Sequence, residues 1–430
     1  MLFAATSLVP KVSALLVPKV SALHARSIRS LALAIILLAI GCTTFEPVPL
    51  DQVPFLERAQ TKSENNVQVT AAVLSAEEAE LIFGPDLYAR GIQPVWLEIR
   101  NNDESAIRFL PVGLDPEYFT PLEVSYITRY RFAKEVNEQT DEYFRKLAMG
   151  NHIGPGATKS GFVFSHLEHG TKIFNVDVIG NDNDLRTFTF IVPVPGLAAD
   201  VTQIDWNTLY KPDEIIEYNR DELRQALNEL PCCVTDPVGN DEGLPLNVVI
   251  IGNLDDLVYA LTRGGWDATE RTTSLHVDAT RIPGTDDRYR PVSIRNTYGR
   301  PQDASFSKSR LDGWPHSHLR LWLSPMTVDG ISVWLGEVGR DIPARAKLSG
   351  RLVDADDARM MLFQDFLFSQ TLGFVGAVKR GNAVAEEQTY ADPLGGTFIA
   401  DGIRYVLGLS SDPVALADVQ LMQWEAMSWR

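Results

Sequence analysis

Two alternating segments joined by a tight-turn signal constrain the fold of this chain more than any other feature. Residues 316–323, His-Ser-His-Leu-Arg-Leu-Trp-Leu, alternate with a period of two, and residues 331–335 form a second apolar-rich segment. That period is typical of a β-strand, whose successive side chains point to opposite faces. The dipeptide Asp329-Gly330 lies between the segments and favours a two-residue hairpin turn. The sequence therefore predicts an antiparallel hairpin with its tip at these two residues.

The predicted turn also fixes a register, because residues at equal distances from a two-residue loop face each other. The predicted partners are Trp322 with Glu337, Arg320 with Gly339, and His318 with Asp341. The three leucines of the first strand lie on the opposite face in this register. Five polar side chains then share one face, and they are the candidate catalytic residues: His316, His318, Arg320, Glu337 and Asp341.

This polar face has two interpretations. A His-X-His pair beside carboxylates is a minimal constellation for metal binding or acid–base chemistry. The alternative is a hairpin whose polar face is solvated or forms ion pairs across the strands. Two histidines without a third strong ligand are a minimal signal, so we expect no cofactor and no bound metal. The choice between enzyme and non-enzyme stays open here, with the non-catalytic interpretation preferred.

The N-terminus carries a predicted targeting segment. Residues 24–29 supply positive charge, residues 31–40 are an unbroken apolar run, and Gly41-Cys42 follows at once. The run is shorter than the roughly 20 residues needed to span a bilayer, which favours a signal peptide over residues 1–41. The stretch Leu38-Ala-Ile-Gly-Cys42 resembles a bacterial lipoprotein signal, although Ala39 stands where that pattern usually has Leu. The resemblance implies lipidation at Cys42.

The expected location is the cell envelope. Thr43, rather than Asp, follows the lipidated cysteine, which by resemblance to Gram-negative lipoproteins implies the outer membrane facing the periplasm. The expected partners are the membrane, through the lipid anchor, and another envelope or secretion protein. A net charge of −17 excludes nucleic acid, because such binding depends on Lys and Arg neutralising phosphates. The adjacent Cys232 and Cys233 are predicted to be free, partly buried thiols, since no disulfide framework is visible.

The fold class predicted for the whole chain is α+β. Several short alternating segments with turn signals predict an immunoglobulin-like β-sandwich in the N-terminal half, and helical and strand patterns mix after it. The predicted divisions are a signal peptide (1–41), a tether (42–66), a β-sandwich domain (67–196), a linker (197–222), an α+β domain (223–415) and a C-terminal tail (416–430).

Between about residue 223 and residue 410 the chain contains a series of distinctive segments: residues 247–266, 298–308, 318–323, 333–341 and 354–370, followed by Asp392-Pro393 and residues 401–404. In their order and spacing these segments resemble the LssY C-terminal domain family. The family is named for an association with type I secretion, and the resemblance implies no particular reaction. A Thr-His-bearing segment common in relatives before the acidic helix is missing here, where Ala-Lys-Leu-Ser-Gly-Arg-Leu-Val stands instead.

Two functions follow from these observations. The first is a membrane-anchored, non-catalytic envelope lipoprotein that binds or scaffolds another protein in secretion or envelope maintenance. The second is a hydrolase or metal-dependent enzyme that uses the face formed by His316, His318, Arg320 and Asp341. The sequence has no nucleophile elbow, HExxH motif, P-loop or Cys/His zinc spacing that would favour the second.

Overall fold

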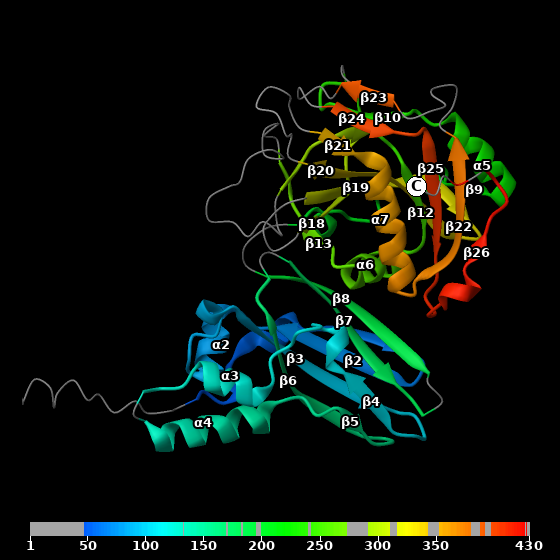
Figure 1. Cartoon of the computed structure of the whole chain (residues 1–430). Coiled ribbons are helices and arrows are strands. Elements are labelled where there is room, and N and C mark those ends of the chain that lie inside the picture. The colour runs from blue at the N-terminus through cyan, green and yellow to red at the C-terminus, as the bar shows by residue number, and fades with distance from the viewer. Residues whose placement is uncertain are drawn as a thin grey trace, which may run out of the picture.

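The computed structural model describes two units that lie one against the other (Figure 1). The described residues are 47–131, 133–168, 171–181, 184–194, 199–239, 242–272, 291–309, 316–342, 352–379, 388–391, 397–425 and 427. The predicted signal peptide and Cys42 therefore lie outside the described residues. Within the described ranges, no helix combines the length and the apolar character needed to cross a membrane.

Two antiparallel four-stranded sheets form the centre of the N-terminal unit. The first sheet has the order β1 (Gln60–Glu64), β2 (Val67–Val73), β3 (Ile92–Asn101), β6 (Thr158–His166). The second has the order β5 (His152–Ile153), β4 (Ile107–Leu110), β7 (Thr171–Ile179), β8 (Leu185–Pro193). Alternate apolar residues of both sheets share one buried core, as in a sandwich. The immunoglobulin-like arrangement in particular is not confirmed by these strand orders.

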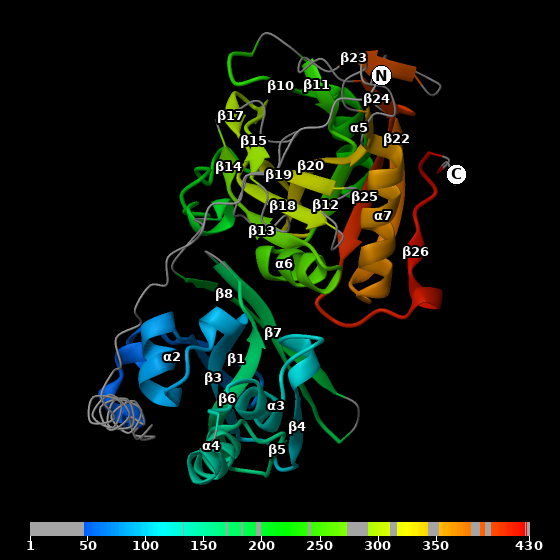
Figure 2. The same ribbon diagram turned by 60° about the vertical axis from the view of Figure 1, so that its left-hand side comes forward.

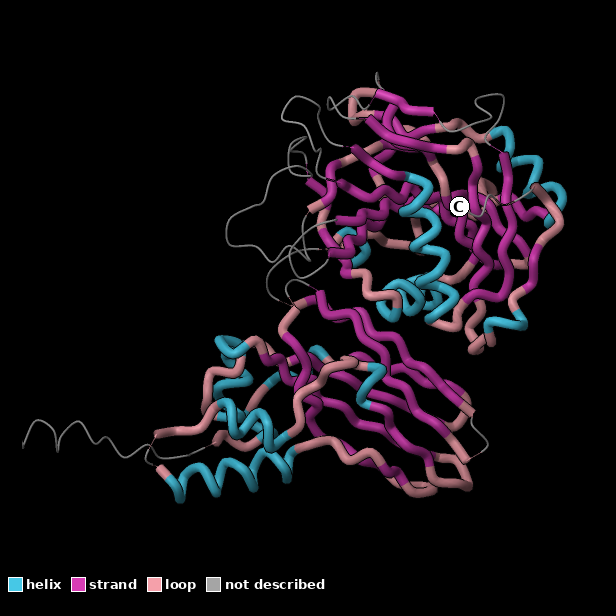
Figure 3. Tube along the Cα trace, in the orientation of Figure 1, coloured by secondary structure: helices cyan, strands magenta, loops and turns pink. Residues whose placement is uncertain are grey.

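Helices cover the outer face of the first sheet, as the cyan segments of Figure 3 show. They are α2 (Ala76–Phe83), α3 (Pro121–Ile127) and α4 (Lys134–Leu147), with the short turns η1 (Leu50–Gln52), η2 (Pro54–Arg58), η3 (Tyr88–Arg90) and η4 (Pro111–Gly113) nearby. Capping boxes at Ser75 and Thr120 begin α2 and α3. Strand β3 is consequently buried on both faces.

The predicted tether over residues 42–66 is wrong for most of its length. Phe55 is buried against Trp96 and Phe162, and β1 pairs with β2 along its whole length. Packing begins as early as Val48, whose backbone N–H donates to Leu81 O. Pro54 is the first residue of η2, a position where a missing N–H costs little, and Pro49 directly precedes η1.

A mixed twelve-stranded sheet organises the C-terminal unit, which confirms the α+β class. Its main path has the order β13 (Asp267–Thr269), β18 (Ala304–Ser309), β19 (His316–Val328), β20 (Ile331–Ile342), β12 (Val248–Ile251), β25 (Ile403–Leu409), β22 (Leu372–Lys379), β26 (Gln420–Leu421). Four shorter strands join its borders: β9 (Ile216–Tyr218), β21 (Leu352–Asp354), β23 (Gln388–Ala391) and β24 (Thr397–Ala400).

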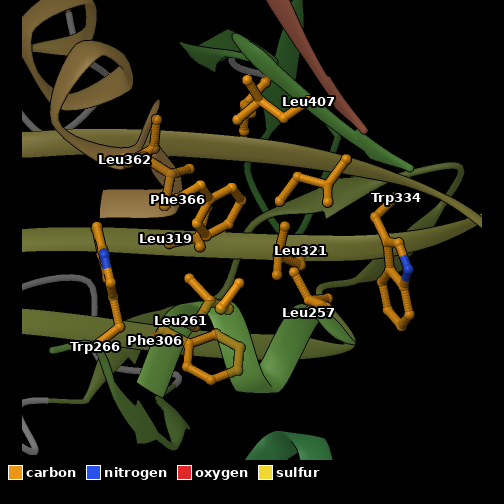
Figure 4. Close-up of a cluster of buried hydrophobic side chains, with 14 of the residues drawn as sticks. Leu257, Leu261, Trp266, Phe306, Leu319, Leu321, Trp334, Leu362, Phe366 and Leu407 are labelled. Carbon is orange, nitrogen blue, oxygen red and sulfur yellow. The ribbon is translucent and has the colours of Figure 1, made fainter. Parts of the chain in front are cut away.

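Two helices, α6 (Leu254–Arg263) and α7 (Ala355–Phe368), pack on one face of this sheet (Figure 2). Leu257 and Leu261 of α6 meet Leu319 and Leu321 of β19 there, as Figure 4 shows. Burying each such leucine stabilises the fold by about 1.5–3 kcal/mol. The other face packs against α5 (Arg220–Glu229), which begins at the capping residue Asn219. Both faces of the sheet are therefore buried.

Two small sheets complete the C-terminal unit. One has the order β11 (Glu242–Pro245), β10 (Cys233–Thr235), β16 (Asn296–Thr297), β17 (Arg300–Pro301), and the other pairs β14 (Arg271–Thr272) with β15 (Val292–Ser293). Near β10, Cys232 and Cys233 are joined by a disulfide, so the prediction of free thiols is wrong. Spacing alone did not reveal this bond, because adjacent cysteines close only a small ring.

The predicted linker and tail are parts of the C-terminal unit. In the linker, η5 (Asp200–Thr202) enters the core and Trp206 packs edge-on against Trp334 at 5.2 Å between ring centres. Strand β9 pairs with the hairpin strand β19. In the tail, η8 (Leu416–Asp418) precedes β26, which pairs with β22. Both segments are too irregular in sequence for periodicity to find them.

The hairpin of β19 and β20 has the predicted turn but a shifted register. Near the tip Val328 pairs with Ile331 as predicted, and Asp329 and Gly330 both have positive φ. A bulge between Leu323 and Thr327 then adds two residues to β19. Beyond it the partners are His316 with Asp341, His318 with Gly339, Arg320 with Glu337 and Trp322 with Leu335. The predicted pairs are therefore wrong by two positions, and an even shift keeps every side chain on its predicted face.

Candidate site on the polar face of the hairpin

All five predicted residues lie together at one end of the hairpin, on the face turned away from α6 and α7. They are His316, His318 and Arg320 of β19, and Glu337 and Asp341 of β20. Alternation places them there, since residues two apart share a face of a strand. None of the five has more than 2% of its surface exposed. The face is therefore not solvated, which leaves a polar site or a face ion-paired across the strands.

Asp341 lies between the two imidazoles. Its Oδ2 is 3.7 Å from His316 Nδ1, and its Oδ1 is 3.7 Å from His318 Nδ1. Both separations exceed the range of a hydrogen bond, which ends near 3.2 Å for N–H···O. One donor atom from each of His316, His318 and Asp341 lies within 4.8 Å of the other two. Among the described residues, His318 Nδ1 is a buried nitrogen with no hydrogen-bond partner.

A chain of charged groups holds the opposite side of the His318 ring. His318 Nε2 lies 3.1 Å from Glu337 Oε1, and Arg320 donates to the other oxygen of Glu337. Arg320 in turn donates from Nε to Ser293 O at 2.9 Å and from Nη2 to Ser293 Oγ at 2.8 Å. Ser293 belongs to β15, so this short strand, which lies outside the main sheet, fixes the position of the Arg320 guanidinium by hydrogen bonds. The orientation of His318 is thus set through three successive side chains.

These contacts shift the pKa values of the buried groups. Burial alone raises the pKa of Glu337, but the charges of Arg320 and His318 and their hydrogen bonds outweigh it, and the pKa of Glu337 falls to about 2. Burial alone lowers the pKa of His318, but the nearby carboxylates, Asp341 first, outweigh both burial and Arg320, and the pKa rises. Glu337 is therefore a carboxylate at neutral pH.

Gly339 makes room for the His318 ring. A Cβ atom at Gly339 would lie 2.8 Å from both Cε1 and Nε2 of His318, and 2.9 Å from a methyl group of Val353. Glycine inside a strand often marks such a close approach. Gly339 and Ser293 are the two residues of this site that sequence reasoning missed. Gly339 was detectable in principle, because it lies on the same face as Glu337 and Asp341. No local signal identified Ser293.

The three donor groups are also of the kinds that bind a transition metal. Two donors about 2.1 Å from one zinc ion lie about 3.4 Å apart in tetrahedral geometry, which is close to the two His–Asp separations of 3.7 Å. Two imidazoles and one carboxylate are ligands for zinc or another divalent transition metal. Calcium and magnesium prefer sites made of oxygen atoms. The second candidate role, an ion-paired cluster without metal, is supported by the contacts of Glu337 with His318 and Arg320.

A surface cavity of about 530 Å³ lies elsewhere, in the N-terminal unit beside α4. Arg129, Lys134 and Asp141 are among its lining residues, and none of the five candidate residues lines it. Arg129 and Asp141 form an ion pair with each other at 3.1 Å.

Part of the C-terminal unit is similar to a known protein family. No curated protein matches the chain. A family model described as LssY C-terminus matches residues 227–373, which include the whole hairpin and all five candidate residues. The match covers less than half of the chain, and the later segments at Asp392-Pro393 and residues 401–404 lie beyond it. The central part of the C-terminal unit, residues 227–373, is therefore similar to the LssY C-terminus family.

Proposed function

We propose that this protein is a lipid-anchored protein of the bacterial envelope whose LssY C-terminal domain binds one divalent transition-metal ion. His316, His318 and Asp341 are the protein ligands. The observation that carries the metal proposal is the buried grouping of their donor atoms, all within 4.8 Å of one another. The proposal departs from the expectation of no metal, because the donor atoms of both histidines and Asp341 are buried and close together.

The metal proposal is tested on the full chain, purified in detergent. We expect about one equivalent of zinc, or of a zinc substitute, to bind after dialysis, as measured by elemental mass spectrometry. Replacement His318→Ala should abolish stoichiometric binding, because two protein ligands rarely hold zinc. The matched control is His152→Ala, which removes an exposed histidine of β5 in the other unit. Equal metal content in the His318→Ala and wild-type proteins would exclude this site.

The anchor proposal depends on the sequence around Cys42. Cells fed a clickable palmitate should label the wild-type protein, and the label should fractionate with outer membranes. The Cys42→Ser variant should lose the label, because the thiol carries the lipid. Equal labelling of both proteins would contradict lipidation at this residue, and label in the inner membrane would contradict the location alone.

A non-catalytic binding role remains our proposal for the whole protein. It is supported by ion pairs that join the two units, Lys62 with Asp255 at 2.6 Å and Arg263 with Asp177 at 3.2 Å. Such contacts suit a protein that presents a fixed surface to an envelope or secretion partner. Cross-linking in intact cells, followed by mass spectrometry, should recover the same envelope protein from wild type and from His318→Ala. Recovery of no reproducible partner would contradict this role.

Hydrolysis is a second candidate function, and it is favoured by the number of protein ligands at the proposed metal site. Three protein donors leave a coordination position for water, and zinc-bound water is a nucleophile near neutral pH. The zinc-loaded protein should then cleave chromogenic ester or phosphate substrates, and His318→Ala should lose that activity. Turnover no higher than that of the metal-free protein would exclude hydrolysis of these substrates and leave the binding role.

A further inference from the structure

We infer that Glu337, Arg320 and Ser293 determine which nitrogen of His318 binds the ion, so that the ion is held by Nδ1. This inference rests on the metal-binding role proposed above. A neutral imidazole carries one proton, and the nitrogen without it is the one that can bind a metal. The two nitrogens of His318 face different groups: Nε2 lies 3.1 Å from Glu337 Oε1, whereas Nδ1 lies 3.7 Å from Asp341 Oδ1.

Glu337 fixes the proton on Nε2. A carboxylate accepts hydrogen bonds and offers none, so Nε2 must be the donor in this contact. The lone pair is then on Nδ1 and points to the side where Asp341 lies. Metal-binding histidines commonly donate their second ring N–H to a carboxylate in this way, which fixes the tautomer and makes the ring a better ligand. Glu337 is thus a positioning residue and lies on the far side of the ring from the ion.

Arg320 and Ser293 fix Glu337 in turn. The guanidinium of Arg320 is 2% exposed and donates to Glu337 Oε2, which leaves Oε1 directed at His318. Two donations to Ser293 hold the guanidinium at its other edge. The strand β15 therefore reaches the metal position through three intervening side chains, without supplying a ligand of its own.

The strand register supports the same coordination. His318 faces Gly339 across the hairpin, and its ring lies over the position where a larger residue would place Cβ. A 180° rotation of the ring about its Cβ–Cγ bond exchanges Nδ1 with Cδ2 and Nε2 with Cε1, and would break the hydrogen bond from Nε2 to Glu337. Packing and hydrogen bonding thus favour one orientation.

The test uses the full chain in detergent with cadmium-113 as the probe and with ¹⁵N-labelled histidine. The seven histidines of the chain keep such a spectrum tractable. Long-range proton–nitrogen spectra should show a proton on His318 Nε2 and cadmium coupling to His318 Nδ1. Coupling to Nε2 would overturn the inference while leaving the metal proposal intact. Absence of cadmium binding in the wild type would instead overturn the metal proposal.

Zinc affinity of variants provides the second measurement. Glu337→Gln keeps an acceptor but loses the charge, and we expect zinc affinity to fall about 10–100-fold, as for other partners of metal-binding histidines. Ser293→Ala removes the hydroxyl that accepts a hydrogen bond from Arg320 and should give a smaller loss of zinc affinity. Because this substitution is mild, the test stays valid if Glu337→Gln does not fold.

The matched control is Asp401→Asn, which weakens another carboxylate–arginine pair of the same domain, bonded to Arg359 at 2.7 Å. It should retain wild-type affinity. Wild-type zinc affinity in both Glu337→Gln and Ser293→Ala would show that the hydrogen bonds from Ser293 to His318 have only a structural role. An equal loss of affinity in Asp401→Asn would show the same.

Discussion

Replacement of Gly339 by alanine tests the geometry of the site most directly. The added Cβ would lie 2.8 Å from two atoms of the His318 ring, and contact distances below about 3.4 Å require a neighbour to move. The ring must therefore shift by about 0.6 Å, the difference between these two distances. Metal–ligand distances tolerate deviations of only about 0.2 Å. We expect zinc affinity to fall at least about tenfold, which corresponds to about 1.4 kcal/mol.

The same substitution should also cost stability, since overpacking a tight site typically costs about 1–3 kcal/mol. A control must therefore destabilise the same strand without touching the ligands. Gly336→Ala meets this requirement, because its Cβ would lie 2.4 Å from a methyl group of Val248, and residue 336 faces away from the site. Denaturant unfolding should show losses of similar size in the two variants.

The assay is competition for zinc against a chromogenic chelator, at a temperature where both variants are folded. Gly339→Ala should bind zinc weakly, and Gly336→Ala should bind it like the wild type. Wild-type affinity in Gly339→Ala would refute the placement of His318 over the glycine. Equal losses in both variants would show that strand stability, rather than ring position, controls binding.

Three further predictions concern the rest of the molecule. Burial raises the pKa of Asp200 to about 6 from its ordinary value of 3.8, so its contribution to stability is fully present below about pH 3.8 and is lost as pH rises through about 6. Calorimetry should therefore show that the stability of Asp200→Asn relative to the wild type increases between pH 4 and 7.5. The increase should reach about 3 kcal/mol, at 1.36 kcal/mol per pKa unit. A difference in stability that does not change with pH would contradict the shift. Mass spectrometry after iodoacetamide should find Cys232 and Cys233 unmodified before reduction and both modified after it; labelling of the unreduced protein would mean that the thiols are free. Leu257→Ala should destabilise the C-terminal unit by about 2–5 kcal/mol in urea unfolding, whereas Leu416→Ala, at a residue 61% exposed, should change it by less than about 0.5 kcal/mol.

The sequence predicted the composition of the site better than its pairing. Alternation alone placed His316, His318 and Arg320 on one face, because the side-chain period of a strand is two. The exact partners were wrong, since the bulge inserts two residues near the tip. Pro325 lies in the inserted stretch and was a usable signal, because proline inside a sheet is confined to edges, strand starts and bulges. The neighbouring Ser324 hydroxyl donates to Val333 O at 2.6 Å and ties the bulge to β20.

Burial of the polar face could not be predicted from periodicity. An alternating strand normally has one wet face, yet here β15 contributes Ser293 to the buried side of Arg320. That contact joins residues 27 positions apart through a short strand with no pattern of its own. The same reason explains the misjudged tether and linker, whose short strands β1 and β9 are defined by the sheets they join. Tertiary contacts, rather than local propensity, determine such segments.

The bulge between Leu323 and Thr327 also restricts the insertions and deletions that this hairpin can accept to even numbers of residues. Gain or loss of two residues at the tip leaves both imidazoles on the side of Asp341. A one-residue change in the bulge would turn His316 and His318 toward the leucine-lined surface of α6 and α7 and expel the leucines from it. Length variation here should therefore occur in even steps. An insertion or deletion of one residue would have to be balanced by a second one between the hairpin tip and Trp322.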